Sequence, residues 1–231
     1  METKTGVLNG IGVGVGDPDM LTIKAVKCIK ESDVICLPRK DKTKCRAYQI
    51  ARAAVPEIDQ KQIIGFDFAM ITDKSILQKK HQEIYESVKE YLAEGKIISF
   101  LTIGDPTVYS TFASIAEQAQ KDNVQVRIIN GINSFCACAA RLGISLCEGD
   151  SSLHVISDIE DLEMALSLSG TKIIMKCAGS LPAVKKCLLD LKYPVKVYAV
   201  ADCGTAQEKV YYGIEEIPEN STYMMTIIVK E

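Results

Sequence analysis

Histidine is scarce in this chain, and the sequence has no Cys-x-x-Cys pair. The histidines are His81 and His154, and nine cysteines are scattered among apolar segments. Structural zinc sites draw on closely spaced Cys and His ligands, so the sequence argues against a protein-bound metal. Cys136 and Cys138 flank a single alanine, which leaves a soft-metal or redox site open as an alternative. An odd number of scattered thiols fits a reducing compartment better than a disulfide framework.

Long apolar runs and an excess of positive charge are also missing. No run approaches the roughly 20 apolar residues that a membrane-spanning helix needs, so we expect no membrane association. The opening segment METKTGVLNGIG lacks the basic-then-apolar layout of a secretory signal, and we expect a cytoplasmic protein. The formal net charge of −3 argues against a nucleic-acid partner, because such binding relies on a basic surface.

The first half of the chain alternates short apolar segments with helical patterns. Val- and Ile-rich segments bounded by Gly, Pro or Asp predict strands, at residues 6–15, 33–38, 62–68, 96–103 and 124–129. Apolar residues at helical spacing predict helices between them, at residues 18–30, 44–54, 73–93 and 106–120. Strands that alternate with helices form βαβ units, so we predict an α/β domain with a mostly parallel sheet.

The second half predicts another α/β domain with a different sheet. The expected strands are residues 153–157, 172–176, 196–201, 208–212 and 224–230, and the expected helices are 133–142, 159–168 and 180–191. Short turns join the last three strands, which indicates antiparallel neighbours and hence a mixed sheet. We place the domain boundary near 129–132, which gives domains of 1–130 and 131–231. A cleft between the two domains is the natural place for a ligand.

Two stretches share the pattern of an apolar strand, Gly-Asp-Pro and a helix. They are GVGVGDPDMLTIKA at residues 12–25 and FLTIGDPTVYST at residues 100–111. In each corner the Asp can cap the first helical turn and the Pro suits the first helical position. Open α/β sheets bind ligands at the carboxyl ends of their strands. The repeated corner therefore predicts two binding loops, although well-capped turns alone would give the same pattern.

The glycines of the first corner do not match two common nucleotide-binding motifs. Gly12, Gly14 and Gly16 are spaced two apart, whereas the Rossmann fingerprint requires G-x-G-x-x-G. Asp17 would also repel a pyrophosphate. No G-K-[ST] follows, which excludes a P-loop. An NAD-dependent oxidoreductase is therefore disfavoured, while a non-catalytic nucleotide-binding module stays an alternative.

Both corners and the segment NGINSFCACAARLGISLCEGD at residues 130–150 resemble the tetrapyrrole methyltransferase family. Members of this family use S-adenosylmethionine in corrin and sirohaem synthesis. The combination of GDPTVYSTF with SFCACAARLGI is most similar to the branch that methylates carbon 20 of precorrin-2 or its cobalt complex. A sibling enzyme that acts at another ring carbon or on uroporphyrinogen III is the alternative.

The resemblance implies a homodimer of two-domain α/β subunits that bind both ligands in the interdomain cleft. It assigns the first glycine-rich loop to the tetrapyrrole substrate, through Gly14, Gly16, Asp17 and Pro18. It assigns to S-adenosylmethionine Ile103, Gly104, Asp105, Val108, Tyr109, Ser134, Phe135, Met175, Lys176, Cys203, Gly204 and Thr226. Structural roles compete at some of these positions, with Met175 and Val108 as core residues and Ser134 as a helix cap.

The expected chemistry needs positioning more than it needs a metal. A sulfonium methyl group is already electrophilic, so the protein must hold the substrate carbon in line with it. Asp17 and Tyr109 are candidates by position for a base that collects the proton lost from carbon 20. His81 lies in the charged stretch KKHQE, which is typical of a solvated face.

A substrate rich in carboxylates should meet cationic side chains. The segment RKDKTKCR at residues 39–46 follows a predicted strand, and we expect it beside the first glycine corner. Arg39 and Arg46 are the preferred ligands because a guanidinium binds a carboxylate in a bidentate manner. An exposed, solvated loop is the competing interpretation.

Overall fold

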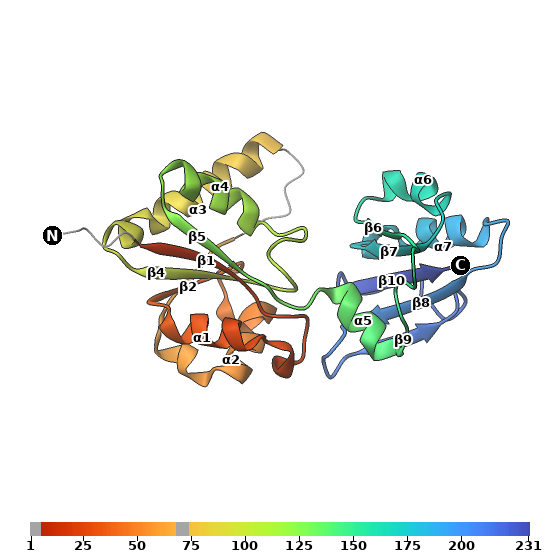
Figure 1. Ribbon diagram of the computed structural model, residues 1–231, viewed down its shortest axis with the longest axis horizontal. Coiled ribbons are helices and arrows are strands. Elements are labelled where there is room, and N and C mark those ends of the chain that lie inside the picture. Colours follow the sequence, from red (N-terminus) through yellow and green to blue (C-terminus); the bar gives the residue numbers. More distant parts are fainter. Residues whose placement is uncertain (1–5, 68–73) are drawn as a thin grey trace. The chain divides into compact units, whose positions relative to one another are not determined.

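The computed structural model describes residues 6–67 and 74–231. The chain divides into two compact units, Met1–Asn133 and Ser134–Glu231 (Figure 1). Phe68 and Asp73, at the ends of a predicted strand and a predicted helix, lie outside the described residues. No helix within 6–67 and 74–231 is long and apolar enough to cross a membrane.

The first unit is built on a five-stranded sheet in which every pair of neighbours is parallel, as predicted. Its order is β3-β2-β4-β1-β5. The strands are β1 (Val7–Gly12), β2 (Val34–Leu37), β3 (Gln62–Gly65), β4 (Ile97–Thr102) and β5 (Gln125–Ile129). The helices are α1 (Ile23–Glu31), α2 (Arg46–Ala54), α3 (Lys74–Ala93) and α4 (Phe112–Lys121).

Helices cover both faces of this sheet, with α1 and α2 on one side and α3 and α4 on the other (Figure 1). Side chains along β1 point to both faces of the sheet. Ile11 packs in the core under α1 and α2, and Leu8 packs in the core under α3 and α4. A Cβ on Gly10 would lie 2.3 Å from the Phe112 ring, so this glycine lets the aromatic side chain pack directly on the strand.

Two predicted helices begin later than the sequence pattern indicated. Thr22 caps α1, while Asp17 caps a short 3-10 turn at Pro18–Met20 instead. Asp105 caps no α-helix, since α4 begins at Phe112 and not at residue 106. The physical reason is local: the Asp105 carboxylate binds Thr107, and Tyr109 has a φ of 49°, which no α-helix contains.

The prediction of a solvated His81 is wrong. His81 is only 4 % exposed, and burial lowers the pKa of its imidazole. It lies on the face of α3 that also buries Tyr85, Val88 and Leu92. Helical spacing places these residues together, whereas the charges next to His81 in the sequence occupy other faces.

The second unit carries a mixed sheet in the order β6-β7-β10-β8-β9. Its strands are β6 (Leu153–Ile156), β7 (Thr171–Met175), β8 (Lys196–Ala201), β9 (Lys209–Tyr212) and β10 (Met225–Lys230), and its helices are α5 (Ser134–Leu142), α6 (Leu162–Leu166) and α7 (Leu181–Leu189). The β6 and β7 strands are parallel and the other neighbours are antiparallel. The β10 strand lies between β7 and β8, and five of its six side chains are buried, whereas β9 forms the edge and is only partly buried.

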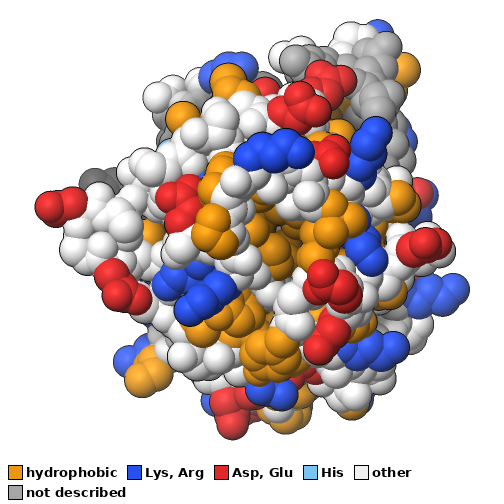
Figure 2. Space-filling model, turned by 90° about the vertical axis from the view of Figure 1, so that its right-hand side faces the viewer, with side chains coloured by type: hydrophobic (Ala, Val, Ile, Leu, Met, Phe, Trp, Pro, Cys, Tyr) orange, Lys and Arg blue, Asp and Glu red, His pale blue; other side chains and the backbone are white. Residues whose placement is uncertain are grey.

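One face of this sheet packs against α6 and α7, and α5 lies on the other face (Figure 1). Apolar side chains also reach the surface, where Figure 2 shows them gathered in a shallow hollow among acidic and basic side chains. A groove of about 600 Å³ runs along α6 and α7 and is lined by residues such as Leu166, Cys187, Leu191 and Tyr193. None of the sequence-predicted site residues lines this groove.

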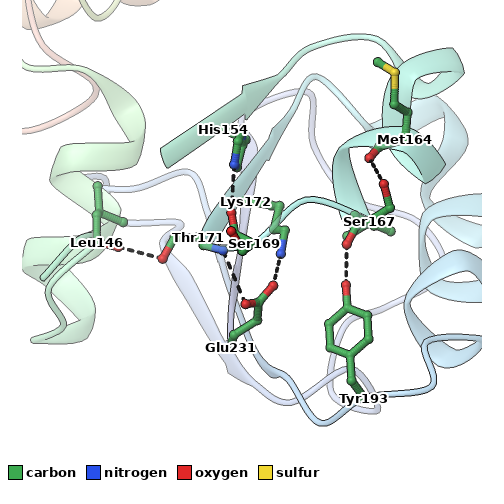
Figure 3. A network of polar contacts seen from close by, with 11 residues as sticks. Leu146, His154, Met164, Ser167, Ser169, Thr171, Lys172, Tyr193 and Glu231 are labelled. Atoms are coloured by element: carbon green, nitrogen blue, oxygen red, sulfur yellow. Dashed lines mark hydrogen bonds and ion pairs between the residues drawn. The ribbon is translucent and has the colours of Figure 1, made fainter. Parts of the chain in front are cut away.

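A buried lysine lies near the start of β7. The Lys172 side chain is 1 % exposed and its ammonium group contacts the carboxylate of Glu231 (Figure 3). The other carboxylate oxygen accepts from the backbone N–H of Gly170 at 3.3 Å, and the Lys172 ammonium lies 5.9 Å from the centre of the Tyr193 ring. The contact with the Lys172 ammonium lowers the pKa of the Glu231 carboxyl group.

We expect Glu231→Gln to lower the free energy of unfolding by about 1–3 kcal/mol. Breaking a fully buried ion pair costs about 3–5 kcal/mol. We expect a smaller loss of stability here because the Glu231 side chain is 38 % exposed. Because its folded-state pKa is lowered, the contribution is complete above about pH 4.3 and is lost as the pH falls further. Denaturant unfolding at pH 7 and below pH 4 measures both effects.

The matched control for this pair is Glu148→Gln. Its carboxylate pairs with Lys230 at 3.7 Å but is 79 % exposed, so we expect little change. The double variant Lys172→Met with Glu231→Gln should recover stability, since apolar replacements of buried pairs are often neutral. Equal losses for Glu231→Gln and Glu148→Gln would contradict the argument.

Candidate functional site

Three loops meet at the carboxyl edge of the first sheet, after the adjacent strands β4, β1 and β5. The backbone N–H of Gly104 donates to the carbonyl oxygen of Gly14 at 2.8 Å, and that of Val13 donates to the carbonyl of Thr102 at 2.9 Å. The two Gly-Asp-Pro corners are therefore hydrogen-bonded to each other. What the sequence presents as two separate loops is one joined structure.

Glycine is required at this junction for two different reasons. Gly14 and Gly104 have φ values of 71° and 72°, in the left-handed region that favours glycine. Gly131, after β5, instead approaches other backbone closely: a Cβ there would lie 2.2 Å from the carbonyl oxygen of Gly104 and 2.7 Å from the carbonyl carbon of Gly12. A Cβ on Gly104 itself would meet nothing closer than an oxygen at 4.0 Å, so that side of the loop is open.

The Asp105 carboxylate ties the second corner to the loop after β5. One oxygen accepts from the backbone N–H and the hydroxyl of Thr107 at 2.8 and 2.5 Å. The other accepts from the side-chain amide of Asn130 and the backbone N–H of Gly131, both at 3.0 Å. Burial alone would raise the pKa of Asp105, but these four donors outweigh it and the pKa is lowered.

The carboxylate of Asp105 is thereby fully occupied by the chain itself. An ionised carboxylate accepts about four hydrogen bonds, and Asp105 makes four while only 4 % exposed. Through these four hydrogen bonds, Asp105 restrains the neighbouring backbone of Ile103 and Gly104.

The rest of the second corner is held in an unusual backbone conformation. Tyr109 has a φ of 49° and is 49 % exposed, while Val108 is half-buried. The Ser110 hydroxyl lies 3.2 Å from that of Thr102 and accepts from the backbone N–H of Phe112. Non-glycine residues with positive φ are uncommon and cluster at functional sites.

The predicted residues of the second unit gather at one edge of its sheet. Register pairs Thr226 with Met175 and Met225 with Ala201, so the strand ends that carry Lys176 and Cys203 lie at the same edge. Thr226 also donates to the hydroxyl of Ser134 at 3.4 Å, which brings the start of α5, with Phe135, to this edge. A pocket of about 200 Å³ is lined in part by Met175, Lys176 and Cys177.

Backbone strain marks the same strand ends. Lys176, after β7, and Asp202, after β8, have φ values of 57° and 50°. With Tyr109 they account for three of the four non-glycine residues of positive φ in the described part of the chain, and the fourth is Asn123 after α4. Lys176 therefore lies at a conformationally constrained turn, and Met175, the last residue of β7, is half-buried.

The predicted substrate residues lie at the carboxyl edge of the first sheet. Pro18 and Gly16 are half-buried beside Asp17, whose carboxylate accepts from the backbone N–H of Asp19 at 2.9 Å. The 39–46 segment follows β2, which pairs with β4 and not with β1. Its last residue, Arg46, begins α2, and α2 contacts the Pro18–Met20 turn of the first corner. Arg39 is exposed and Arg46 is half-buried.

Several residues at these two sheet edges, one in each unit, were not predicted from the sequence. They are Thr107, Asn130 and Gly131 in the first unit and Asp202 and Glu208 in the second. The Asp-x-Thr spacing and the Asn-Gly pair after an apolar strand are signals that could have indicated the first three. Within 6–67 and 74–231, no group of three or more His, Cys, Asp or Glu side chains is arranged to hold a metal.

A family model and individual relatives match this chain, and they point to the same family. Residues 7–217 match the sequence model of the family described as Tetrapyrrole (Corrin/Porphyrin) Methylases. A probable cobalt-precorrin-2 C(20)-methyltransferase of Methanocaldococcus jannaschii is 42 % identical over 168 residues, which cover 72 % of this chain and 70 % of that protein. The cobalt-precorrin-2 C(20)-methyltransferase of Salmonella typhimurium is 24 % identical over 98 % of this chain and 97 % of its own.

A solved structure supports the fold. Uroporphyrin-III C-methyl transferase from Thermus thermophilus, complexed with S-adenyl homocysteine, aligns with a TM-score of 0.71 and 19 % identity. The alignment covers 98 % of each chain.

Proposed function

Because the chain belongs to the tetrapyrrole (corrin/porphyrin) methylase family, we propose that it methylates carbon 20 of precorrin-2 or its cobalt complex in cobalamin synthesis. S-adenosylmethionine is the methyl donor in this proposal. Relatives named for this reaction match at 42 % identity over most of the chain and at 24 % over nearly all of it. The structural observation that carries the proposal is the joined pair of Gly-Asp-Pro corners, with one face of Gly104 left open.

The second corner fits a cofactor that binds through backbone contacts. Asp105 holds the loop with four hydrogen bonds and so fixes where the backbone of Ile103 and Gly104 lies. On the side of Gly104 where a Cβ would project, no protein atom lies closer than 4.0 Å, which leaves room for a ligand there. We assign the same cofactor to the constrained strand ends of the second unit, through Met175, Lys176, Cys203, Gly204 and Thr226, and to Ser134, Phe135, Val108 and Tyr109.

Bound S-adenosylmethionine supplies a sulfonium methyl group that is already electrophilic. The protein's own contribution is to fix the substrate carbon in line with that group and to exclude water. Tyr109 is half-exposed and held by its strained backbone, and Asp17 is half-buried at the neighbouring corner. We propose these two as the alternative candidates for the single base that collects the proton released from carbon 20.

We assign the tetrapyrrole carboxylates to Arg39 and Arg46, in the segment that leads into α2 beside the turn of the first corner. Replacing both with Ala should weaken substrate binding by about tenfold or more, since each charged hydrogen bond contributes about 1.5–3 kcal/mol. Affinity for S-adenosylmethionine should stay unchanged. Separate titrations with each ligand measure the two effects, and Arg127→Ala, on the exposed edge strand β5, is the matched control. Unchanged substrate affinity in the double variant would rule out the assignment.

A product assay tests the proposed reaction itself. The protein is incubated anaerobically with precorrin-2 or its cobalt complex and with S-adenosylmethionine that carries a carbon-13 methyl group. One labelled methyl at carbon 20, seen by NMR and mass spectrometry, is the expected result, and the preferred substrate shows whether cobalt is present. A methyl at another ring carbon would point to a sibling enzyme, and cofactor binding without turnover to a non-catalytic module.

Two further parts of this proposal concern the state of the protein in the cell. We propose a cytoplasmic homodimer, as the family resemblance implies. Light scattering of the purified protein measures the mass, and a monomer at micromolar concentration would contradict the dimer.

A further inference from the structure

Glu208 organises the turn after β8 from just before β9. One oxygen of its carboxylate accepts from the backbone N–H of Gly204 at 2.8 Å. The other oxygen pairs with the guanidinium of Arg141, which reaches across from α5. The Glu208 side chain is only 16 % exposed. A single carboxylate therefore joins this turn to α5, the helix that begins at Ser134.

The turn that Glu208 holds has a constrained backbone. Asp202 and Gly204 have φ values of 50° and 74°, and Thr205 donates to the carbonyl of Asp202 through both its N–H and its hydroxyl. The Cys203 thiol, between them, contacts the side chains of Cys138 and Glu208. Burial acts to raise the pKa of Glu208, but the contacts with Gly204 and Arg141 lower it, so the group is charged at neutral pH.

The chain contains a second carboxylate with the same local geometry and none of these surroundings. Glu216 accepts from the backbone N–H of Tyr212 at 2.8 Å, again four residues earlier, at the other end of β9. Glu216 is exposed, and the turn that it holds carries no residue assigned to a ligand. It is therefore a control for loss of a carboxylate-to-backbone hydrogen bond alone.

We infer that Glu208, held by Arg141, is a positioning residue that orients the Cys203–Gly204 backbone for the methyl donor. The inference rests on the proposed function, since it assigns these two residues to S-adenosylmethionine. Glu208 acts through the turn and does not itself contact the reacting atoms. Without its charge the Gly204 N–H loses its acceptor or keeps a weaker one, and the turn samples other conformations.

The test compares Glu208→Gln, Glu208→Ala and Arg141→Ala with Glu216→Gln. We expect the KM for S-adenosylmethionine to rise about tenfold in Glu208→Gln, because a charge-assisted hydrogen bond contributes about 1.5–3 kcal/mol. The rise should be larger in Glu208→Ala and smaller in Arg141→Ala, while kcat and the KM for the tetrapyrrole change less than about twofold. Glu216→Gln should behave like the wild type in every parameter.

Binding of S-adenosylhomocysteine, measured by calorimetry, separates failure of this inference from failure of the proposed function. If the wild type does not bind it, the proposed function fails and the inference fails with it. If the wild type binds it and Glu208→Gln binds equally well, only the positioning role is overturned. Parallel losses of kcat, tetrapyrrole affinity and melting temperature would show a general structural role and overturn the inference as well.

Discussion

Gly131→Ala is expected to lower affinity for S-adenosylmethionine by about 100-fold or more, which corresponds to about 2.7 kcal/mol. Its Cβ would lie 2.2 Å from the carbonyl oxygen of Gly104 and 2.7 Å from the carbonyl carbon of Gly12. Both are backbone atoms, so no side chain can rotate away and one of the corners must move. Overpacking of this kind costs about 1–3 kcal/mol in stability as well. Calorimetric titration and thermal unfolding measure the two quantities.

Gly179→Ala is the matched control for this substitution. Gly179 does not have a positive φ, and a Cβ there would meet nothing within 4 Å. We expect wild-type affinity and unchanged stability in the control. If Gly131→Ala also bound the cofactor with wild-type affinity, the junction of the three loops would have no part in the binding site.

Asp105→Asn is expected to lower the free energy of unfolding by about 2–4 kcal/mol and to weaken cofactor binding. The substitution keeps the shape but turns one acceptor oxygen into an NH2 group that faces donors. Either Thr107 or the Asn130–Gly131 pair then loses its partner, and each buried unsatisfied group costs about 1–3 kcal/mol. Denaturant unfolding and ligand titration measure the loss.

Asp41→Asn provides the control, since Asp41 repeats the local motif on the surface. Its carboxylate accepts from the N–H and hydroxyl of Thr43 at 2.9 and 2.6 Å, as Asp105 does from Thr107. It is exposed, and its other oxygen lies 3.7 Å from the exposed ammonium of Lys44, where Asp105 instead accepts from Asn130 and Gly131. We expect only a small change in stability. A similar loss in both variants would show that the Asp-x-Thr turn alone accounts for the effect.

The contribution of Asp105 should also depend on pH in a definite direction. Its pKa is lowered in the folded protein, so the unfolded chain takes up the proton first. The stability difference between wild type and Asp105→Asn is therefore complete above about pH 4, the unfolded value, and shrinks as the pH falls below it. A difference that grew on acidification would contradict the hydrogen-bonded carboxylate.

Local patterns in the sequence were sufficient for the strands, most helices and the parallel first sheet. Apolar residues that recur every two or about 3.6 positions indicate which face of a strand or helix is buried. This pattern does not depend on which element covers that face. The same patterns were misleading where a residue's neighbours came from elsewhere in the chain. His81 lies among charged residues in the sequence but is buried with Tyr85 and Val88 on one face of α3.

The sequence by itself determined the family, the two corners and the glycines that such corners require. Only the tertiary structure decided that the two corners are hydrogen-bonded to each other and that Asn130 and Gly131 donate to the Asp105 carboxylate. It also decided that β10 lies in the centre of the second sheet. These contacts join residues that are tens of positions apart. Their partners follow from strand order, which hydrophobic periodicity does not encode, because any apolar strand can pair with any other until the whole sheet is packed.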